Sequence, residues 1–195
     1  FSMPSLVMQH AGDRHLCHDN ANKNNPLTEY EIQYYLCHLL VALDALHGIG
    51  IMHRDVKPRN VIIQRHNNNN NKRLTLVDLG LADFYIHNKL YNVRVASRHY
   101  KAPELLVNYG YYGTPIDMWS VGCMLAGLLH HREPFFRGKD NLDMLEKIIQ
   151  VLGVSDLLDF MTAYEIPVTT EIQHVLDKYQ QQQQQQQYRH RRQQL

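Results

Sequence analysis

The residues best suited to chemistry lie in the octapeptide His-Arg-Asp-Val-Lys-Pro-Arg-Asn at positions 53–60. Within it, Asp55 is followed two positions later by Lys57 and five positions later by Asn60. Phosphoryl transfer needs a group that orients a hydroxyl, a cation for the transferred phosphate and an oxygen ligand for a metal ion. An aspartate, a lysine and an asparagine can supply these three functions. The spacing therefore indicates phosphoryl-transfer chemistry.

A second candidate metal ligand, Asp78, follows the apolar stretch 74–77 and lies eighteen residues after Asn60. A carboxylate at the end of a strand could hold the Mg²⁺ that bridges nucleotide phosphates. The alternative is a polar loop followed by an unrelated turn, because Asp, Lys and Asn are common in solvated loops. The joint spacing of the two stretches favours the catalytic interpretation.

The composition is that of a globular protein without an evident membrane or disulfide framework. The 195 residues, 44% of them hydrophobic, can bury a substantial core, and the length predicts one domain. Cys17, Cys37 and Cys123 lack paired spacing, so we expect reduced thiols that serve for packing. No apolar run approaches the roughly 20 residues of a spanning helix, and the first residues lack a signal pattern. We therefore expect no membrane partner.

Positive charge is concentrated around the candidate site. The net charge is +1, yet residues 54–101 hold ten Lys and Arg against three acids. Arg94, Arg98 and Lys101 recur at intervals of three or four within this strip. Such a strip suits acidic peptides or nucleotide phosphates, and a nonspecific polyanion patch is the alternative.

Four elements are expected around these residues. Thr28 and Glu31 form a capping box before a helix of about 19 residues that stops at Gly48, and its His38 and His47 are expected to pack or face solvent. Residues 61–63 and 74–77 predict a hairpin whose tip carries five asparagines. A further helix is expected from Thr114 and Pro115 to about residue 130, buried almost all round, and another at 141–152.

These stretches resemble the catalytic loop and metal-binding motif of protein kinases, and the resemblance narrows to the catalytic subunit of casein kinase II. Ala102, Pro103 and Glu104 match the signature that closes the activation segment. Four further blocks carry the narrower resemblance: Glu-Leu-Leu-Val at 104–107, Asp-Met-Trp-Ser at 117–120, Gly-Cys-Met-Leu at 122–125 and Glu-Pro-Phe-Phe at 133–136. The similarity covers roughly residues 3–165 and fades afterwards.

The resemblance implies a role for each catalytic position. Asp55 would be the base that orients the substrate hydroxyl, and Lys57 would stabilise the γ-phosphate and mark serine/threonine specificity. Asn60 and Asp78 would hold Mg²⁺. Ser97 would bridge the catalytic aspartate and lysine. The family's Asp-Trp-Gly is Asp-Leu-Gly here, which leaves the metal ligand in place.

The resemblance also implies binding and structural residues. The backbone groups of Gln9 and Ala11 would face the adenine edge, with Met8 at the back of the pocket and Ile62 and Val77 as the apolar floor beneath the purine. Acidic residues after the target Ser or Thr would be bound by Arg94, Arg98 and Lys101. Structural roles would fall to His53, Arg54, Glu104 and Asp117. Asp117 would brace the catalytic-loop backbone, and a plain helix-start aspartate is the alternative.

The implied fold class is α+β, a protein-kinase-like fold that consists mostly of the helical C-terminal lobe. We expect residues 1–11 to end the N-terminal lobe and form the hinge, 12–166 to form a partial C-terminal lobe, and 167–195 to form a low-complexity tail of glutamines and basic residues. The implied cofactors are ATP, with GTP as a second donor, and Mg²⁺. The implied partners are acidic protein substrates and the regulatory beta subunit of casein kinase II. A nuclear and cytoplasmic location is implied, and no specific nucleic acid is expected.

The chain lacks the family's glycine-rich phosphate loop and strand lysine, so we expect a fragment with little activity alone. Two hypotheses remain. The first is an acidophilic serine/threonine kinase seen through a partial sequence. The second is a truncated, inactive product that binds peptides or competes for partners.

Overall fold

The computed structural model describes residues 15–16, 26–65 and 72–193, with side chains up to residue 185. The residues predicted to line the adenine pocket, Met8, Gln9 and Ala11, lie outside the described residues, as do the five asparagines of the predicted hairpin tip.

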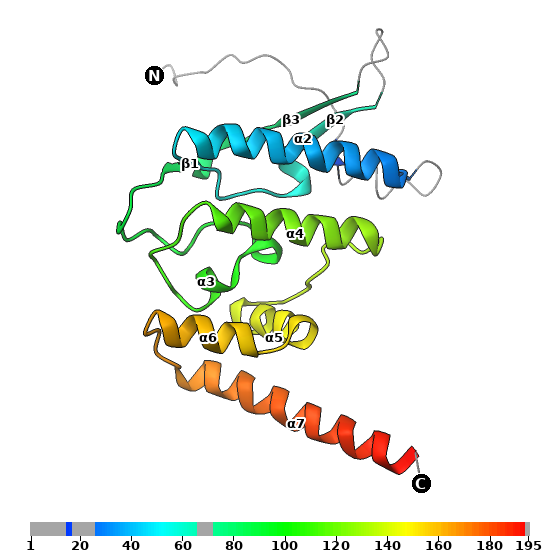
Figure 1. Cartoon of the computed structure of the whole chain (residues 1–195), viewed down its shortest axis with the longest axis vertical. Coiled ribbons are helices and arrows are strands. Elements are labelled where there is room, and N and C mark those ends of the chain that lie inside the picture. Colours follow the sequence, from blue (N-terminus) through cyan, green and yellow to red (C-terminus); the bar gives the residue numbers. More distant parts are fainter. Residues whose placement is uncertain (1–14, 17–25, 66–71, 194–195) are drawn as a thin grey trace, which may run out of the picture.

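Helices dominate the described part of the chain, and the strands are few and short. Figure 1 shows α2 and the β2–β3 hairpin at one end, α4 and α3 in the middle, then α5 and α6, and α7 at the opposite end. The α-helices are α2 (Glu29–Gly48), α3 (Pro103–Leu106), α4 (Pro115–Leu129), α5 (Asn141–Leu152), α6 (Ser155–Ala163) and α7 (Thr170–Gln193). The strands and 3₁₀ helices are β1 (Ile51–Met52), η1 (Pro58–Asn60), β2 (Val61–Gln64), β3 (Arg73–Leu76), η2 (Leu79–Leu81), β4 (Asp83–Phe84) and η3 (Arg98–Tyr100).

Helix α2 begins at the predicted capping box. The Glu31 N–H donates to Thr28 Oγ1 at 3.2 Å, and the Thr28 N–H donates to Glu31 Oε2 at 3.0 Å. These two bonds satisfy backbone donors that the first turn would otherwise leave unpaired. The buried face then follows helical spacing with Ile32, Tyr35 and Leu39. The helix therefore forms where the sequence predicts it.

Two antiparallel strand pairs frame the loop between them. The predicted hairpin is β2 paired with β3, with Ile62 opposite Thr75. Strand β1 pairs with β4, with Met52 opposite Asp83. Because β1 ends at Met52 and β2 begins at Val61, residues 53–60 are held at both ends by strands.

Helix α4 differs from expectation in two respects. Its Pro115 suits the first helical position, where an N–H would have no helical partner. The Thr114 side chain makes no capping bond, and the Thr114 carbonyl accepts from the Asp117 N–H at 3.0 Å instead. The expectation of burial all round is also wrong, because Leu129 is 56% exposed and Met118 44%.

The tail also differs from a plain low-complexity segment. Helix α7 packs against α5, and its first turns bury Ile172, Val175 and Leu176 in the main core. These positions have helical spacing, but the apolar run is short and stops before the glutamines, so the sequence alone gives only a weak helix signal here. No side chain described after Leu176 is buried.

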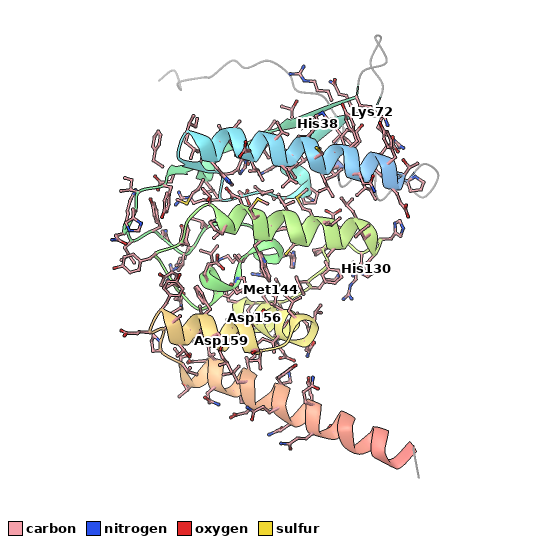
Figure 2. All side chains as sticks on the ribbon, in the orientation of Figure 1. His38, Lys72, His130, Met144, Asp156 and Asp159 are labelled. Atoms are coloured by element: carbon pink, nitrogen blue, oxygen red, sulfur yellow. The ribbon has the colours of Figure 1, made fainter. Side chains whose placement is uncertain are left out.

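The main core lies between the helices. Figure 2 shows Met144 in the interior of the stack, and its side chain is fully buried. Cys123 also packs there, and burial raises the pKa of its thiol to about 12. Within the described residues, no helix is long and apolar enough to cross a bilayer.

Candidate active site

The backbone of the 53–60 loop is held from below by Asp117 of α4. Asp117 Oδ2 accepts the His53 N–H and Asp117 Oδ1 accepts the Arg54 N–H, both at 2.8 Å. Asp117 is 1% exposed, so a low-dielectric setting strengthens both charge-assisted bonds. Arg54 takes a left-handed φ of 64°, which these two bonds help to hold. Asp117 thus binds the backbone of the loop, which is the structural role that the resemblance implies for it.

His53 connects the loop to the segment that carries Asp78. Its ring is fully buried, and Nδ1 accepts the Asp55 N–H at 3.3 Å. Nε2 must then carry the hydrogen that it donates to the Val77 carbonyl at 3.1 Å. This pairing assigns the tautomer and aligns the two candidate motifs side by side.

The Asp55 carboxylate receives hydrogen bonds on both oxygens. Oδ1 accepts the N–H of Ser97 at 3.1 Å and its hydroxyl at 2.8 Å. Oδ2 accepts Lys57 Nζ at 2.6 Å and Asn60 Nδ2 at 3.2 Å. Ser97 Oγ in turn accepts from Lys57 Nζ at 3.0 Å. The predicted catalytic residues Asp55, Lys57, Asn60 and Ser97 therefore form one connected cluster.

Asn60 is buried and orients its amide toward the loop. Nδ2 also donates to the backbone carbonyl of Asp55 at 2.9 Å. The backbone carbonyl of Asn60 accepts the Val77 N–H at 2.9 Å. With both Nδ2 bonds directed at Asp55, the side-chain oxygen remains as the group that can bind a cation.

Asp78 has different surroundings. It is exposed, adopts a left-handed φ of 70°, and its Oδ1 accepts the Gly80 N–H at 3.3 Å. The pair of an exposed carboxylate and an amide oxygen fits Mg²⁺, which prefers oxygen ligands and keeps several waters. Asp78 and Asn60 would hold that ion, and their sharing of it stays a prediction. The described residues contain no cluster of three or more His, Cys, Asp or Glu suited to a metal.

Arg54 joins the loop to the following segment. Its Nε donates to the Leu81 carbonyl at 2.6 Å, and one terminal nitrogen lies 3.3 Å from the Tyr112 hydroxyl. The same nitrogen lies 3.4 Å from Asp83 Oδ2. These contacts connect the 53–60 loop to η2 and β4.

The three predicted substrate-binding cations lie around η3. Arg94 and Arg98 are exposed, and no ion pair engages either of them among the described residues. Lys101 is half-buried and donates to the Val93 carbonyl at 3.3 Å. Burial first, and then the neighbouring Arg98 charge, lower the pKa of Lys101. The strip therefore presents positive charge that the described chain does not neutralise.

The remaining predicted residues lie at the edges of this cluster. Ile62 is buried in β2, and Val77 directly follows β3 and is half-buried. Glu104 lies in the first turn of α3, where burial raises the pKa of its carboxyl group.

Two contacts escaped the sequence prediction. His47, expected to pack or face solvent, places Nε2 2.9 Å from Asp117 Oδ2. Arg65 pairs with Glu31, with Nε 2.9 Å from Oε1 and a terminal nitrogen 2.6 Å from Oε2. The Arg65 hydrogen bond is the first cause that lowers the pKa of Glu31 to about 2. The capping box signalled Glu31, but no local pattern pointed to its partner 34 residues away.

Comparison with known families agrees with this geometry. The chain matches the protein kinase domain over residues 3–191, which is nearly its full length. The chain therefore belongs to the protein kinase domain family, whose members are ATP-binding transferases that act on proteins and generally use Mg²⁺. The mostly helical architecture with few short strands is consistent with the α+β fold of a kinase C-terminal lobe.

Proposed function

We propose that the protein is a serine/threonine kinase of the casein kinase II catalytic type, which transfers the γ-phosphate of ATP to Ser or Thr followed by acidic residues. The observation that carries this proposal is the cluster in which Lys57 and Ser97 both contact the Asp55 carboxylate, at 2.6 and 2.8 Å. A lysine two residues after the base is the family's serine/threonine feature.

In this proposal Asp55 does the proton chemistry. An oxygen of its carboxylate accepts a hydrogen bond from the substrate hydroxyl, orients it and takes up its proton. The hydroxyl oxygen bonds to the γ-phosphorus of ATP while the bond from that phosphorus to the β,γ-bridging oxygen breaks, and ADP leaves. Lys57 supplies positive charge to the transferring phosphoryl group, and Ser97 holds both side chains in register. Mg²⁺, held by Asn60 and Asp78, would neutralise charge on the nucleotide phosphates.

Substrate preference would come from the strip of Arg94, Arg98 and Lys101. A carboxylate or phosphate on the substrate gains charge-assisted hydrogen bonds there, and Arg supplies a fork that Lys does not. We further propose ATP, with GTP as a second donor, a regulatory beta subunit as partner, and residence in nucleus and cytoplasm. Binding of adenine near Met8, Gln9 and Ala11, over Ile62 and Val77, is part of the same proposal.

The test uses two peptides that differ only in charge. One carries Ser followed by Asp and Glu, and the other carries Asn and Gln at those positions. The full-length protein, including the phosphate loop and strand lysine that this chain lacks, is incubated with Mg²⁺ and labelled ATP, with Asp55→Asn as the inactive control. We expect labelling of the acidic peptide alone, and loss of that preference in Arg94→Ala/Arg98→Ala/Lys101→Ala. Equal labelling of both peptides would overturn the acidophilic assignment.

A second candidate function is an inactive module that binds acidic peptides. The exposed Asp78, whose carboxylate bonds to its own turn, favours this candidate. Fluorescence anisotropy with the same two peptides separates the candidates. Preferential binding of the acidic peptide without phosphate transfer would support the module, whereas transfer that Asp55→Asn abolishes would support the kinase.

A further inference from the structure

Ser155, the first residue of α6, carries a hydroxyl group that acidic residues follow along the chain. Asp156 comes directly after it, and Asp159 comes three positions later. All three residues are exposed, and Figure 2 shows Asp156 and Asp159 on α6. A serine followed by acidic residues is the target class of the proposed function. The chain therefore contains such a target in its own sequence.

Two other hydroxyl residues of the described chain directly precede an acid, and both are engaged. Thr28 Oγ1 accepts the Glu31 N–H at 3.2 Å and donates to Glu31 Oε2 at 3.1 Å. The Thr170 hydroxyl donates to Glu171 Oε2 at 3.3 Å. The Ser155 hydroxyl makes no hydrogen bond with any residue that the structure describes. Of the three candidates, Ser155 can accept a phosphoryl group without breaking a side-chain bond.

The start of α6 is weakly held. The helix has nine residues, of which the core fully buries Met161 alone. Val154, the residue before the helix, gives the first turn no side-chain hydrogen bond. Helices shorter than about 12 residues are marginal without tertiary packing, and segments with few buried contacts open at low cost. The first turn can therefore unwind and present Ser155 in an extended segment.

The acids of α6 match the cations next to the catalytic cluster. The Ser97 hydroxyl donates to Asp55 Oδ1 at 2.8 Å, and Arg98, which is exposed, directly follows Ser97 along the chain. A serine bound at Asp55 therefore places the acid that follows it near an arginine. Arginine and carboxylate form charge-assisted hydrogen bonds, so Asp156 would help to hold the segment in place.

We propose that Ser155 is a self-phosphorylation site, at which one copy of the protein modifies a second copy. This inference rests on the proposed function. Strand β1, which leads into the 53–60 loop, lies at the α2 end of the molecule, whereas α6 lies beyond α4 and α3 (Figure 1). This separation places the donor site and the acceptor on different copies.

The transfer is the proposed reaction with Ser155 as the substrate. Ser155 Oγ of the acceptor copy bonds to the γ-phosphorus of ATP held by the donor copy. The bond from that phosphorus to the β,γ-bridging oxygen breaks, and ADP leaves. Asp55 of the donor copy takes up the hydroxyl proton.

The test mixes two forms of the full-length protein. A tagged Asp55→Asn form is the acceptor, and an untagged active form, treated beforehand with a phosphatase that is then removed, is the donor. After incubation with Mg²⁺ and labelled ATP, the forms are separated and the label is mapped by mass spectrometry of their peptides. We expect phosphate on Ser155 of the tagged form, at a rate proportional to the donor concentration.

The acidic peptide from the test of the proposed function is included in the same mixture. Labelling of this peptide without phosphate on Ser155 would overturn the inference and leave the proposed function intact. If neither is labelled, the proposed function fails and the inference fails with it.

Charge variants of the acceptor test why Ser155 is chosen. Asp156→Asn/Asp159→Asn should lower the rate of Ser155 labelling about tenfold, because the carboxylates that the cations bind are lost. Asp44→Asn, at an exposed position of α2, is the control and should leave the rate unchanged. An unchanged rate in the double variant would contradict the assignment of the site.

Ser155→Ala separates the acceptor from its neighbours. Combined with Asp55→Asn, it should abolish the label in the peptide that spans α6. Label that persists there would place the acceptor at Thr162 and overturn the inference. In the active form, Ser155→Ala should leave the labelling of the acidic peptide unchanged, because the side chain lies outside the cluster around Asp55.

Discussion

Asp55 and Asp78 are assigned to the same reaction, yet their surroundings differ. Asp55 is 6% exposed and receives hydrogen bonds from Lys57, Asn60 and Ser97. Asp78 is exposed, and within the described part of the chain its carboxylate accepts one hydrogen bond, from the Gly80 N–H at 3.3 Å. The Asp55 side chain is thus held by several segments at once, whereas among the described residues the Asp78 side chain bonds only to its own turn. Changes at the first should cost stability, and changes at the second should cost ligand binding alone.

The largest effect is expected from Asp117→Ala, which removes the brace beneath the loop. The variant leaves the buried His53 N–H, the partly buried Arg54 N–H and the His47 ring without their acceptor. We expect the free energy of unfolding to fall by about 3–5 kcal/mol, measured by urea denaturation. Asp159→Ala is the control, because Figure 2 shows Asp159 on α6 and its side chain is exposed. A loss below about 1 kcal/mol in Asp117→Ala would contradict the claim that the loop around Asp55 is important for stability.

A smaller loss of stability is expected from Arg65→Met, which removes the ion pair between α2 and the residue that follows β2. Glu31 would keep its capping bonds but lose the bidentate partner that holds its charge in a buried setting. We expect about 2–4 kcal/mol of destabilisation at neutral pH by the same assay. Arg73→Met, at an exposed position of β3, should leave stability nearly unchanged.

The same pair predicts a pH dependence. The pKa of Glu31 is lowered from 4.5 to about 2 in the folded protein. A lowered folded pKa contributes stability that is fully present above pH 4.5 and is lost as the pH falls toward 2. The difference in stability between the parent protein and Arg65→Met should therefore shrink across this window. A constant difference from pH 5 to about 2 would contradict the assignment.

Ser97→Ala tests the cluster itself with a smaller change. It removes the hydroxyl that bonds Asp55 and Lys57 but keeps the backbone N–H on Asp55. We expect about 1 kcal/mol of lost stability and, if the proposed kinase activity is observed, roughly a tenfold fall in kcat with KM little changed. Ser155→Ala, an exposed residue that opens α6, is the control. A change confined to KM would place Ser97 in substrate binding instead.

The sequence predicted the elements whose signals are local. The capping box located the start of α2, two short apolar runs located the hairpin, and α5 ends at the predicted residue 152, before Gly153 with its φ of 83°. The spacing within 53–60 also identified residues that the structure brings together around Asp55. In each case the information lies within a few consecutive residues.

Contacts between distant segments could not be predicted in the same way. His47 meets Asp117 across 70 positions, and no local pattern specifies which partner a lone histidine will take. The orientation of Asp78 likewise depends on a left-handed backbone turn, which its own side chain type does not determine. The burial of Ile172 and its neighbours depends on α5 as a partner surface.

The smallest effect on stability is expected from Asp78→Asn. This variant directly tests the difference between the surroundings of Asp78 and Asp55. The side chain is exposed and loses only a weak bond within its own turn, and asparagine tolerates the left-handed conformation. We expect a change in unfolding free energy within about 0.5 kcal/mol. The amide is a poorer Mg²⁺ ligand than the carboxylate, so Mg²⁺-dependent nucleotide binding, measured by calorimetry with and without chelator, should be lost. If the variant kept both its stability and its Mg²⁺ dependence, Asp78 would not be a metal ligand. If it unfolded, the turn that carries Asp78 would be as important for stability as the loop around Asp55.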